Sequence, residues 1–250
     1  MKISNDDLLR YSKQIILKQV GVLGQKKILS AKVLIVGMGG LGCPILIYLT
    51  SLGINNIGIA DHDKVDLSNL NRQILFNTSD VGRFKVIQAK KFFQKINKKI
   101  KINIYKEGIT GKNIHNILRT YDIICDCSDN FNTRYLLNDF CLKNKKILIS
   151  AAISKFEAHI FNFNFSKNIP CYRCFMPEIP EAENKCDVEG ILPTVAGIAG
   201  TIQANEVVKS IIGKQNELVG RMIVFNTLNL NFRKIKLTKN TYCIMGCGKK

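Results

Sequence analysis

Apolar and polar positions alternate along the first 150 residues in a way that predicts strands and helices in turn. Short apolar runs are typical of buried parallel strands, and they occur at residues 32–36, 56–60, 101–105, 123–126 and 146–150. Between them, wider apolar spacing predicts helices at residues 5–20, 41–51, 85–96, 111–119 and 134–143. This order predicts an α/β fold with a doubly wound, Rossmann-like and mainly parallel sheet.

The pattern changes after residue 150. The stretch EAHIFNFNF, residues 157–165, alternates between polar and apolar residues and predicts a meander strand. A loop with cysteines and prolines, a helix at residues 194–212 and strands at 221–226 and 231–237 follow. We therefore expect antiparallel strands to continue the parallel sheet. No repeat or linker divides the chain, so we expect one domain over 1–250, with halves at 1–150 and 151–250.

A glycine-rich loop, GMGGLG, follows the first predicted strand and precedes an apolar helix. Glycines let a backbone turn tightly and approach a phosphate at a helix N-terminus. Nucleotide binding is therefore expected at Gly37, Gly39, Gly40 and Gly42. Asp61 ends the next strand, where a carboxylate can hold ribose hydroxyls. These features alone fit an NAD(P) oxidoreductase as well as an ATP enzyme.

Polar and charged residues further along favour ATP. Arg72 and Lys85 add two cations, and Asp129 with Asn130 follows the strand at 123–126. A nicotinamide ring requires an apolar slot, whereas two cations and a carboxylate near a phosphate chain suit Mg²⁺-assisted attack at phosphorus. The sequence therefore predicts an ATP site with catalytic Mg²⁺.

Composition limits the other function classes. The net charge is +18, but lysines are scattered along the chain rather than clustered, so a nucleic-acid partner is not expected. No apolar run approaches the roughly 18–20 residues that a membrane span requires, and the N-terminus lacks the apolar stretch of a signal peptide. We expect a cytoplasmic protein with no membrane partner.

The nine cysteines fall into different environments. Cys171 and Cys174 form a CxxC pair, and a second pair, Cys243 and Cys247, lies near the C-terminus. Four thiolates suit a tetrahedral structural Zn²⁺ site that fixes the tail to the body. Four other cysteines are expected in or near the core: Cys43, Cys125, Cys127 and Cys141. The three histidines fit no ligand or dyad spacing.

Seven motifs, taken in order, resemble the sulfur-carrier adenylyltransferase family, whose members serve molybdopterin synthase or thiazole biosynthesis and are related to ubiquitin-activating enzymes. They are RYSKQIIL, GMGGLG, DLSNLNRQ, VGRFK, DCSDN, CYRCFMP and NKCDVEGILPTVAGIAGTIQANEVVK. The resemblance implies that the C-terminal Gly-Gly carboxylate of a ubiquitin-like carrier attacks the ATP α-phosphate and forms an acyl-adenylate. It implies that Arg72 and Lys85 neutralise phosphate charge, Asp129 holds Mg²⁺, and Asn69 contacts phosphate. It also implies zinc at the four paired cysteines and a carrier-binding second half.

Three features leave questions open. Lys13 stands where the family has an arginine that reaches the partner subunit's ATP, and lysine lacks the forked guanidinium. Cys186 occupies the family's sulfur-handling or thioester position, with an inert loop thiol as the alternative. The second cysteine pair is spaced CxxxC instead of CxxC.

The resemblance further implies a homodimer and a separate sulfur donor, since no rhodanese-like extension is present. The molybdenum-cofactor carrier is favoured over the thiazole carrier. An inactive carrier-binding scaffold and an NAD(P) oxidoreductase remain as alternatives. A related enzyme that dehydrates a modified tRNA adenosine is disfavoured by the CYRC loop and the paired tail cysteines.

Overall fold

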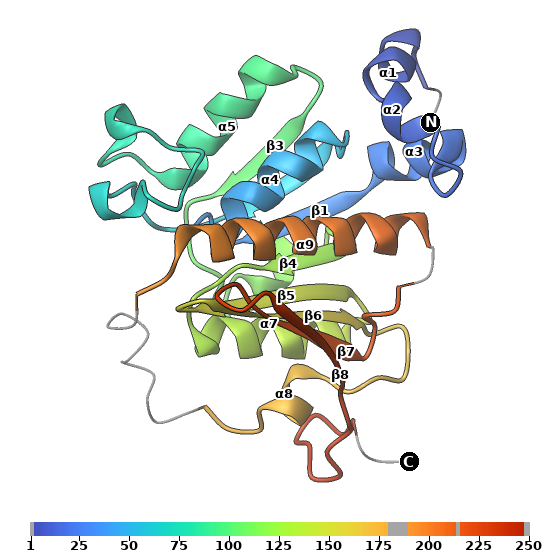
Figure 1. Ribbon diagram of the computed structural model, residues 1–250, viewed down its shortest axis with the longest axis vertical. Helices are drawn as coiled ribbons and strands as arrows, with labels where there is room; N and C mark the ends of the chain where they lie inside the picture. Colours follow the sequence, from blue (N-terminus) through green and yellow to red (C-terminus); the bar gives the residue numbers. More distant parts are fainter. Residues whose placement is uncertain (1–2, 180–189, 214–215, 248–250) are drawn as a thin grey trace.

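A computed structural model describes residues 3–179, 190–213 and 216–247, and these residues form one sheet of eight strands (Figure 1). The strand order is β3-β2-β1-β4-β5-β6-β7-β8. β1 to β5 pair in parallel, and β6, β7 and β8 continue the sheet in antiparallel pairs, which confirms the predicted fold class. The bounds are β1 Lys32–Val36, β2 Asn56–Ala60, β3 Lys101–Tyr105, β4 Ile123–Asp126, β5 Ile147–Ser154, β6 Glu157–Asn164, β7 Arg221–Asn226 and β8 Asn231–Lys236.

Helices cover both faces of the parallel part of the sheet. Successive side chains of a strand point to opposite faces, so Val33 and Ile35 of β1 pack with α4, α5 and α9, whereas Leu34 and Val36 pack with α6 and α7. Figure 1 shows α9 running beside α4. The helix bounds are α1 Asn5–Arg10, α2 Ser12–Ile15, α3 Gly21–Ser30, α4 Gly42–Ser51, α5 Lys85–Ile96, α6 Ile114–Leu118, α7 Phe131–Lys143, α8 Tyr172–Phe175 and α9 Pro193–Ile212, with short 3₁₀ turns at Leu67–Asn69 and Thr78–Asp80.

The single N-terminal helix expected over residues 5–20 is wrong. The chain forms two short helices, α1 and α2, and then α3, which sequence reasoning missed. Tertiary contacts explain the break. The buried Tyr11 ring packs on Gly53, where a Cβ would lie only 2.7 Å from Tyr11 Cζ. Gln14 and Gln25 both donate to the Leu52 carbonyl, at 2.8 and 3.0 Å. The N-terminal segment is thereby anchored at the C-terminal end of α4.

Smaller differences concern the ends of two elements and one additional short helix. β5 extends to Ser154 instead of residue 150 because it pairs with β6 along its whole length. The helix expected at 111–119 is shortened to α6, and the short helix α8 was not foreseen.

Within the described ranges, no helix combines the length and the apolar character needed to cross a bilayer.

Candidate nucleotide site and cysteine cluster

The glycine loop lies where the sheet changes direction. β1 has β2 on one side and β4 on the other, so the loop after β1 sits at the topological switch point, where α/β sheets bind ligands. Gly37 has φ +94°, and a Cβ there would lie 2.6 Å from the Cys127 carbonyl oxygen. A Cβ at Gly42 would lie 2.0 Å from the Gly37 carbonyl oxygen. Packing alone therefore requires glycine at these two positions.

Gly39 and Gly40 serve a different purpose. Among the described residues, a Cβ at Gly39 would meet nothing closer than Gln73 Nε2 at 3.8 Å, so the described part of the structure leaves that stretch of backbone open to a ligand. A Cβ at Gly40 would lie 3.0 Å from Ala196 Cβ and 3.5 Å from Arg72 Cγ. The loop is thus enclosed by α9 and by the segment that carries Arg72.

Asp61 is bound into the loop. One carboxylate oxygen accepts the Met38 N–H at 2.6 Å and the other accepts the Asp63 N–H at 2.7 Å. Burial raises the pKa of the Asp61 carboxyl, while these two N–H groups and Lys85 oppose that rise. Each oxygen keeps a second lone pair. Asp61 therefore fixes the loop and still has acceptor capacity for a ribose hydroxyl.

Lys85 begins α5 and is buried, with its side chain 5% exposed. Its ammonium donates to Asp63 Oδ2 at 2.8 Å, and its backbone N–H donates to the Asp63 carbonyl at 3.0 Å. The Asp63 side chain is 50% exposed. Sequence reasoning chose Lys85 but missed Asp63, although the DxD spacing after β2 was the available signal.

Arg72 is partly buried, and its guanidinium donates to the Ser68 carbonyl at 3.0 Å and to Asn71 Oδ1 at 3.2 Å. Asn69 lies one turn earlier, and its backbone carbonyl accepts from the N–H of Arg72. Sequence reasoning passed over Gln73. Its side chain is buried beside the open backbone of Gly39, and its Oε1 has no hydrogen-bond partner among the residues that the structure describes.

The turn after β4 carries Asp129, whose side chain is exposed. Asn130 instead caps α7, because its Oδ1 accepts the Thr133 N–H at 2.9 Å. Asn130 therefore serves as the N-cap of α7, and a role as a nucleotide ligand is less favoured. Asp126 lies beneath the turn, fully buried, and accepts from Ser128 Oγ at 2.6 Å.

Arg134, which sequence reasoning missed, supports this turn from α7. Its Nε lies 3.3 Å from Asp126 Oδ2, and its Nη2 donates to the Ser128 carbonyl at 2.9 Å. Burial opposes the guanidinium charge, but Asp126 and Tyr172 outweigh that effect and raise the pKa of Arg134. A buried ion pair thus holds the backbone next to Asp129 in place.

Two predicted site residues are not brought to this place by the described structure. Lys13 is exposed on α2, at the end of α4 far from the glycine loop (Figure 1). α4 has 10 residues, which corresponds to about 15 Å of helix. Cys186 lies outside the described residues.

The four paired cysteines converge. Cys171 is the N-cap of α8 and Cys174 lies within this helix. The C-terminal segment brings Cys243 and Cys247 beside them, and all four sulfurs lie within 4.8 Å of one another. The Cys171 sulfur is 4.0 Å from that of Cys174 and 3.7 Å from that of Cys243. Tetrahedral zinc with Zn–S bonds of about 2.3 Å separates its sulfurs by about 3.8 Å, so the cluster fits zinc.

The extra residue of the CxxxC pair is accommodated by a turn. Gly246 has φ +75°, a conformation that favours glycine, and its N–H donates to the Cys243 carbonyl at 2.8 Å. This reverses the chain, so that Cys247 returns to the cluster. The remaining cysteines, Cys43, Cys125, Cys127 and Cys141, are buried as predicted, and burial raises the pKa of each thiol.

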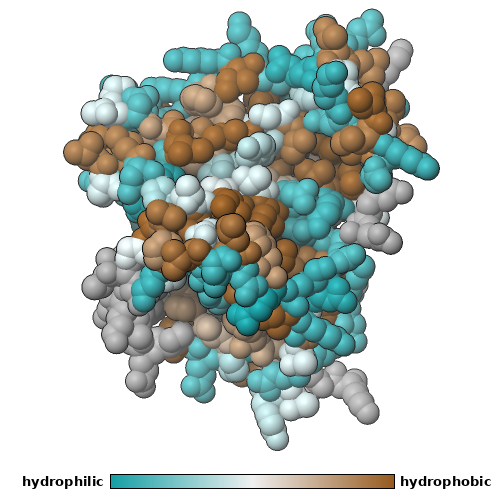
Figure 2. All heavy atoms as spheres, in the orientation of Figure 1, coloured by the Kyte–Doolittle hydropathy of each residue, from teal (hydrophilic) through white to brown (hydrophobic). Residues whose placement is uncertain are grey.

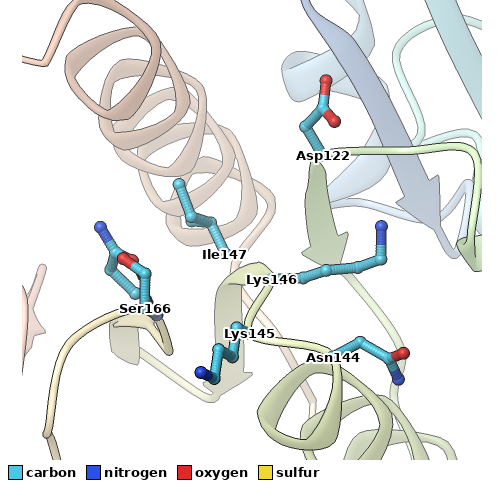
Figure 3. A pocket seen from close by; sticks show the side chains of 7 residues that line it. Asp122, Asn144, Lys145, Lys146, Ile147 and Ser166 are labelled. Atoms are coloured by element: carbon cyan, nitrogen blue, oxygen red, sulfur yellow. Dashed lines mark hydrogen bonds between the residues drawn. The ribbon is translucent and has the colours of Figure 1, made fainter.

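A cavity of about 380 Å³ lies at the opposite end of the sheet, at the amino end of β5 (Figure 3). Lys145 and Asn144 border it from the turn before β5, and Asp122 from the residue before β4. The Lys146 ammonium already donates to the carbonyls of Arg119 and Tyr121. None of the predicted nucleotide ligands lines this cavity.

The switch-point loop and the charged groups around it define the chain as an α/β nucleotide-binding protein. The chain belongs to the ThiF family, whose model matches residues 11–245. A Culex quinquefasciatus protein named adenylyltransferase and sulfurtransferase MOCS3 is 42% identical over 246 residues, covering 97% of this chain and 56% of that protein. The Drosophila virilis protein of the same name is 42% identical over 237 residues, covering 94% of this chain and 52% of that protein.

The chain spans about half the length of the curated relatives it matches. Among solved structures, E. coli MccB with ATP superposes with a TM-score of 0.83 at 25% identity, covering 94% of this chain and 74% of that chain. MccB with MccA-N7isoASN has a TM-score of 0.84 at 24% identity, and the match covers 99% of this chain and 76% of that chain, which supports the fold. The family resemblance inferred from the motifs is therefore confirmed.

Proposed function

We propose that the chain is an ATP-dependent adenylyltransferase that activates the C-terminal Gly-Gly carboxylate of a ubiquitin-like sulfur-carrier protein. The observation that carries this proposal is the placement of Arg72, Lys85 and Asp129 on three segments around one open glycine loop. Relatives named adenylyltransferase and sulfurtransferase, at 42% identity, support it.

The reaction needs charge stabilisation more than proton transfer. A carrier carboxylate oxygen bonds to the α-phosphorus, the bond from that phosphorus to the bridging oxygen breaks, and pyrophosphate leaves. The attacking group is already an anion, so no general base is required. Arg72 and Lys85 then offset the negative charge that develops on the phosphate oxygens. The open backbone of Gly39 and the acceptor capacity of Asp61 suit the phosphates and the ribose.

Two metals belong to the proposal. Asp129 is an exposed carboxylate at the edge of the site, an oxygen ligand of the kind that Mg²⁺ prefers, and Mg²⁺ there would neutralise phosphate charge when bound. Zinc would be held by Cys171, Cys174, Cys243 and Cys247, where it joins α8 to the C-terminal segment. A reduced thiol cluster suits the cytoplasm.

A homodimer would bring Lys13 to an ATP site. Tyr11 and Gln14, on either side of it, are tied to the end of α4, so a four-carbon side chain is too short to reach the glycine loop of its own chain. The N-terminal segment from α1 to α3 also carries the apolar side chains of Leu9, Ile16 and Leu23, which are 80%, 74% and 75% exposed (Figure 2, upper right). Burying this patch against a second copy would place Lys13 in the neighbour's site.

The molybdenum-cofactor carrier is the favoured substrate because it matches the name of the MOCS3 relatives, and the thiazole carrier is the second candidate. Sulfur would come from a separate donor protein. Cys186 is the candidate sulfur-handling cysteine.

The test is ATP–pyrophosphate exchange with purified carrier. Exchange should require the carrier and should be lost when its terminal Gly-Gly is deleted. Exchange without carrier, or none with either carrier, would contradict the proposal. Comparing the two carriers separates the pathways.

A further inference from the structure

Asp63 connects the catalytic lysine to the glycine loop. Its Oδ2 accepts from the Lys85 ammonium at 2.8 Å, and its N–H donates to Asp61 Oδ1 at 2.7 Å. Asp61 in turn accepts from the Met38 N–H inside the loop at 2.6 Å. These three contacts form a continuous path from α5 to the backbone that encloses the phosphates.

The side chains of Lys85 and Asp63 are exposed to solvent to very different extents. The Lys85 side chain is 5% exposed, whereas that of Asp63 is 50% exposed. A buried ammonium without a partner is costly. Within the described part of the chain, Asp63 is the carboxylate in ion-pair contact with this ammonium. Asp63 thus stabilises the lysine charge before any nucleotide is present.

The ammonium has three N–H donors, so one bond to Asp63 leaves two for phosphate oxygens. The Asp63 carbonyl also accepts the Lys85 N–H at 3.0 Å, which fixes the start of α5 against the same residue. Both the backbone and the head group of the lysine are therefore positioned by Asp63.

We propose that Asp63 is a positioning residue that holds the Lys85 ammonium in place and aims it at the phosphates for adenylate formation. This rests on the proposed function. Asp63 acts through Lys85, and its partly exposed carboxylate does not bind the nucleotide itself. The triphosphate supplies a second counter-charge to the ammonium, so Asp63 matters less for ATP binding than for the geometry of the reaction.

The test compares Asp63→Asn and Asp63→Glu in pyrophosphate exchange. Asp63→Asn should lower kcat by about tenfold or more, since small misplacements of catalytic groups cost up to about 100-fold, while KM for ATP stays within about twofold. Asp63→Glu keeps the charge and should recover most of kcat. Asp122→Asn, an exposed carboxylate at the opposite end of the sheet, is the matched control and should behave as wild type.

A double-mutant cycle makes the test specific. In a Lys85→Met background, Asp63→Asn should cause no further loss of kcat, because residues that act as a unit are non-additive. Additive losses, or a raised KM with unchanged kcat in Asp63→Asn, would overturn the proposal.

A second readout needs no carrier. The thermal midpoint of Asp63→Asn without ATP should lie below that of wild type, because the buried Lys85 ammonium has lost its partner, whereas that of Asp63→Glu should lie close to wild type. ATP should raise the midpoints of all three proteins by similar amounts, because their affinities for ATP differ by no more than about twofold. A midpoint of Asp63→Asn equal to that of wild type, or a markedly larger or smaller ATP-induced rise in this variant, would contradict the role of Asp63. Wild-type protein that fails to exchange pyrophosphate would defeat the proposed function instead, and this thermal comparison would still decide the role of Asp63.

Discussion

Single residues in this site have separable roles. Gly37 and Gly42 are required by backbone packing, whereas Gly39 leaves backbone open to a ligand. Spacing in the sequence identified all three, because the strand, loop and helix order fixes where such glycines lie. It did not identify Arg134 or Gln73, since nothing in their local sequence shows that α7 turns a guanidinium under the Asp129 turn or that an amide is buried beside Gly39.

Removing charge from the site should reduce catalysis without unfolding the protein. Arg72→Ala and Asp129→Ala should each lower adenylate formation by about two orders of magnitude, as loss of transition-state stabilisation does. Pyrophosphate exchange measures this. Arg119→Ala, an exposed arginine at the other end of the sheet, serves as the control. Parental rates in both site variants would show that the site is misassigned.

At the scale of elements, α8 and the C-terminal segment bring four sulfurs to within 4.8 Å of one another. The CxxC and CxxxC pairs were visible in the sequence, but their meeting depends on the turn at Gly246 and on the path of the chain after β8. Contacts with the rest of the fold also determine where the N-terminal helices begin and end, whereas the apolar pattern of the sequence predicted one continuous helix.

One tightly bound zinc per chain is expected. Cys171→Ser or Cys243→Ser should release it and lower thermal stability, because binding free energy at a structural zinc site contributes to folding. Elemental analysis of purified protein gives the stoichiometry. Cys141→Ala, in the core on α7, should keep the metal. Metal-free wild-type protein whose stability is unaffected by Cys171→Ser would rule out the zinc site.

The docking of α1 should depend on pH. Lys99 Nζ lies 3.1 Å from Asp7 Oδ1, and hydrogen bonds from Ser4 and Lys99 lower the pKa of Asp7 below its ordinary value of 3.8 despite some burial. A carboxyl with a lowered pKa contributes stability above its unfolded pKa, and this is lost as pH falls through the folded pKa. Lys99→Met should therefore cost less than about 1 kcal/mol at pH 7, and the difference should shrink below pH 3.8.

Urea unfolding of the two proteins across this pH range measures the effect. Lys98→Met, an exposed neighbour, is the matched control. A Lys99→Met deficit that stays constant down to the lowest pH at which the protein folds would mean that Asp7 is not the partner.

On the scale of the whole molecule, the symmetric dimer that we propose would account for both the exposed apolar side chains of the N-terminal helices and the position of Lys13. A two-fold interface pairs identical surfaces and yields two equivalent composite sites. In such a dimer one chain supplies the glycine loop and its partner supplies the cation.

Mixing two inactive variants tests this arrangement. Lys13→Ala and Asp129→Ala should each lose activity alone, but mixed dimers should regain it, because one of their two sites contains both wild-type residues. Lys13→Arg should maintain or raise the rate, since guanidinium binds phosphate bidentately. Exchanged dimers that show no recovery would indicate that Lys13 acts within its own chain or has no catalytic role.

The sequence by itself determined the parallel half of the sheet, the place of the glycine loop and the pairs of cysteines. These features follow from local periodicity and from glycine conformations that operate over a few residues. Only the tertiary structure decided which buried charges are paired. The contacts of Lys85 with Asp63 and of Arg134 with Asp126 join separate elements, and the need to compensate a charge arises only once those elements have excluded water.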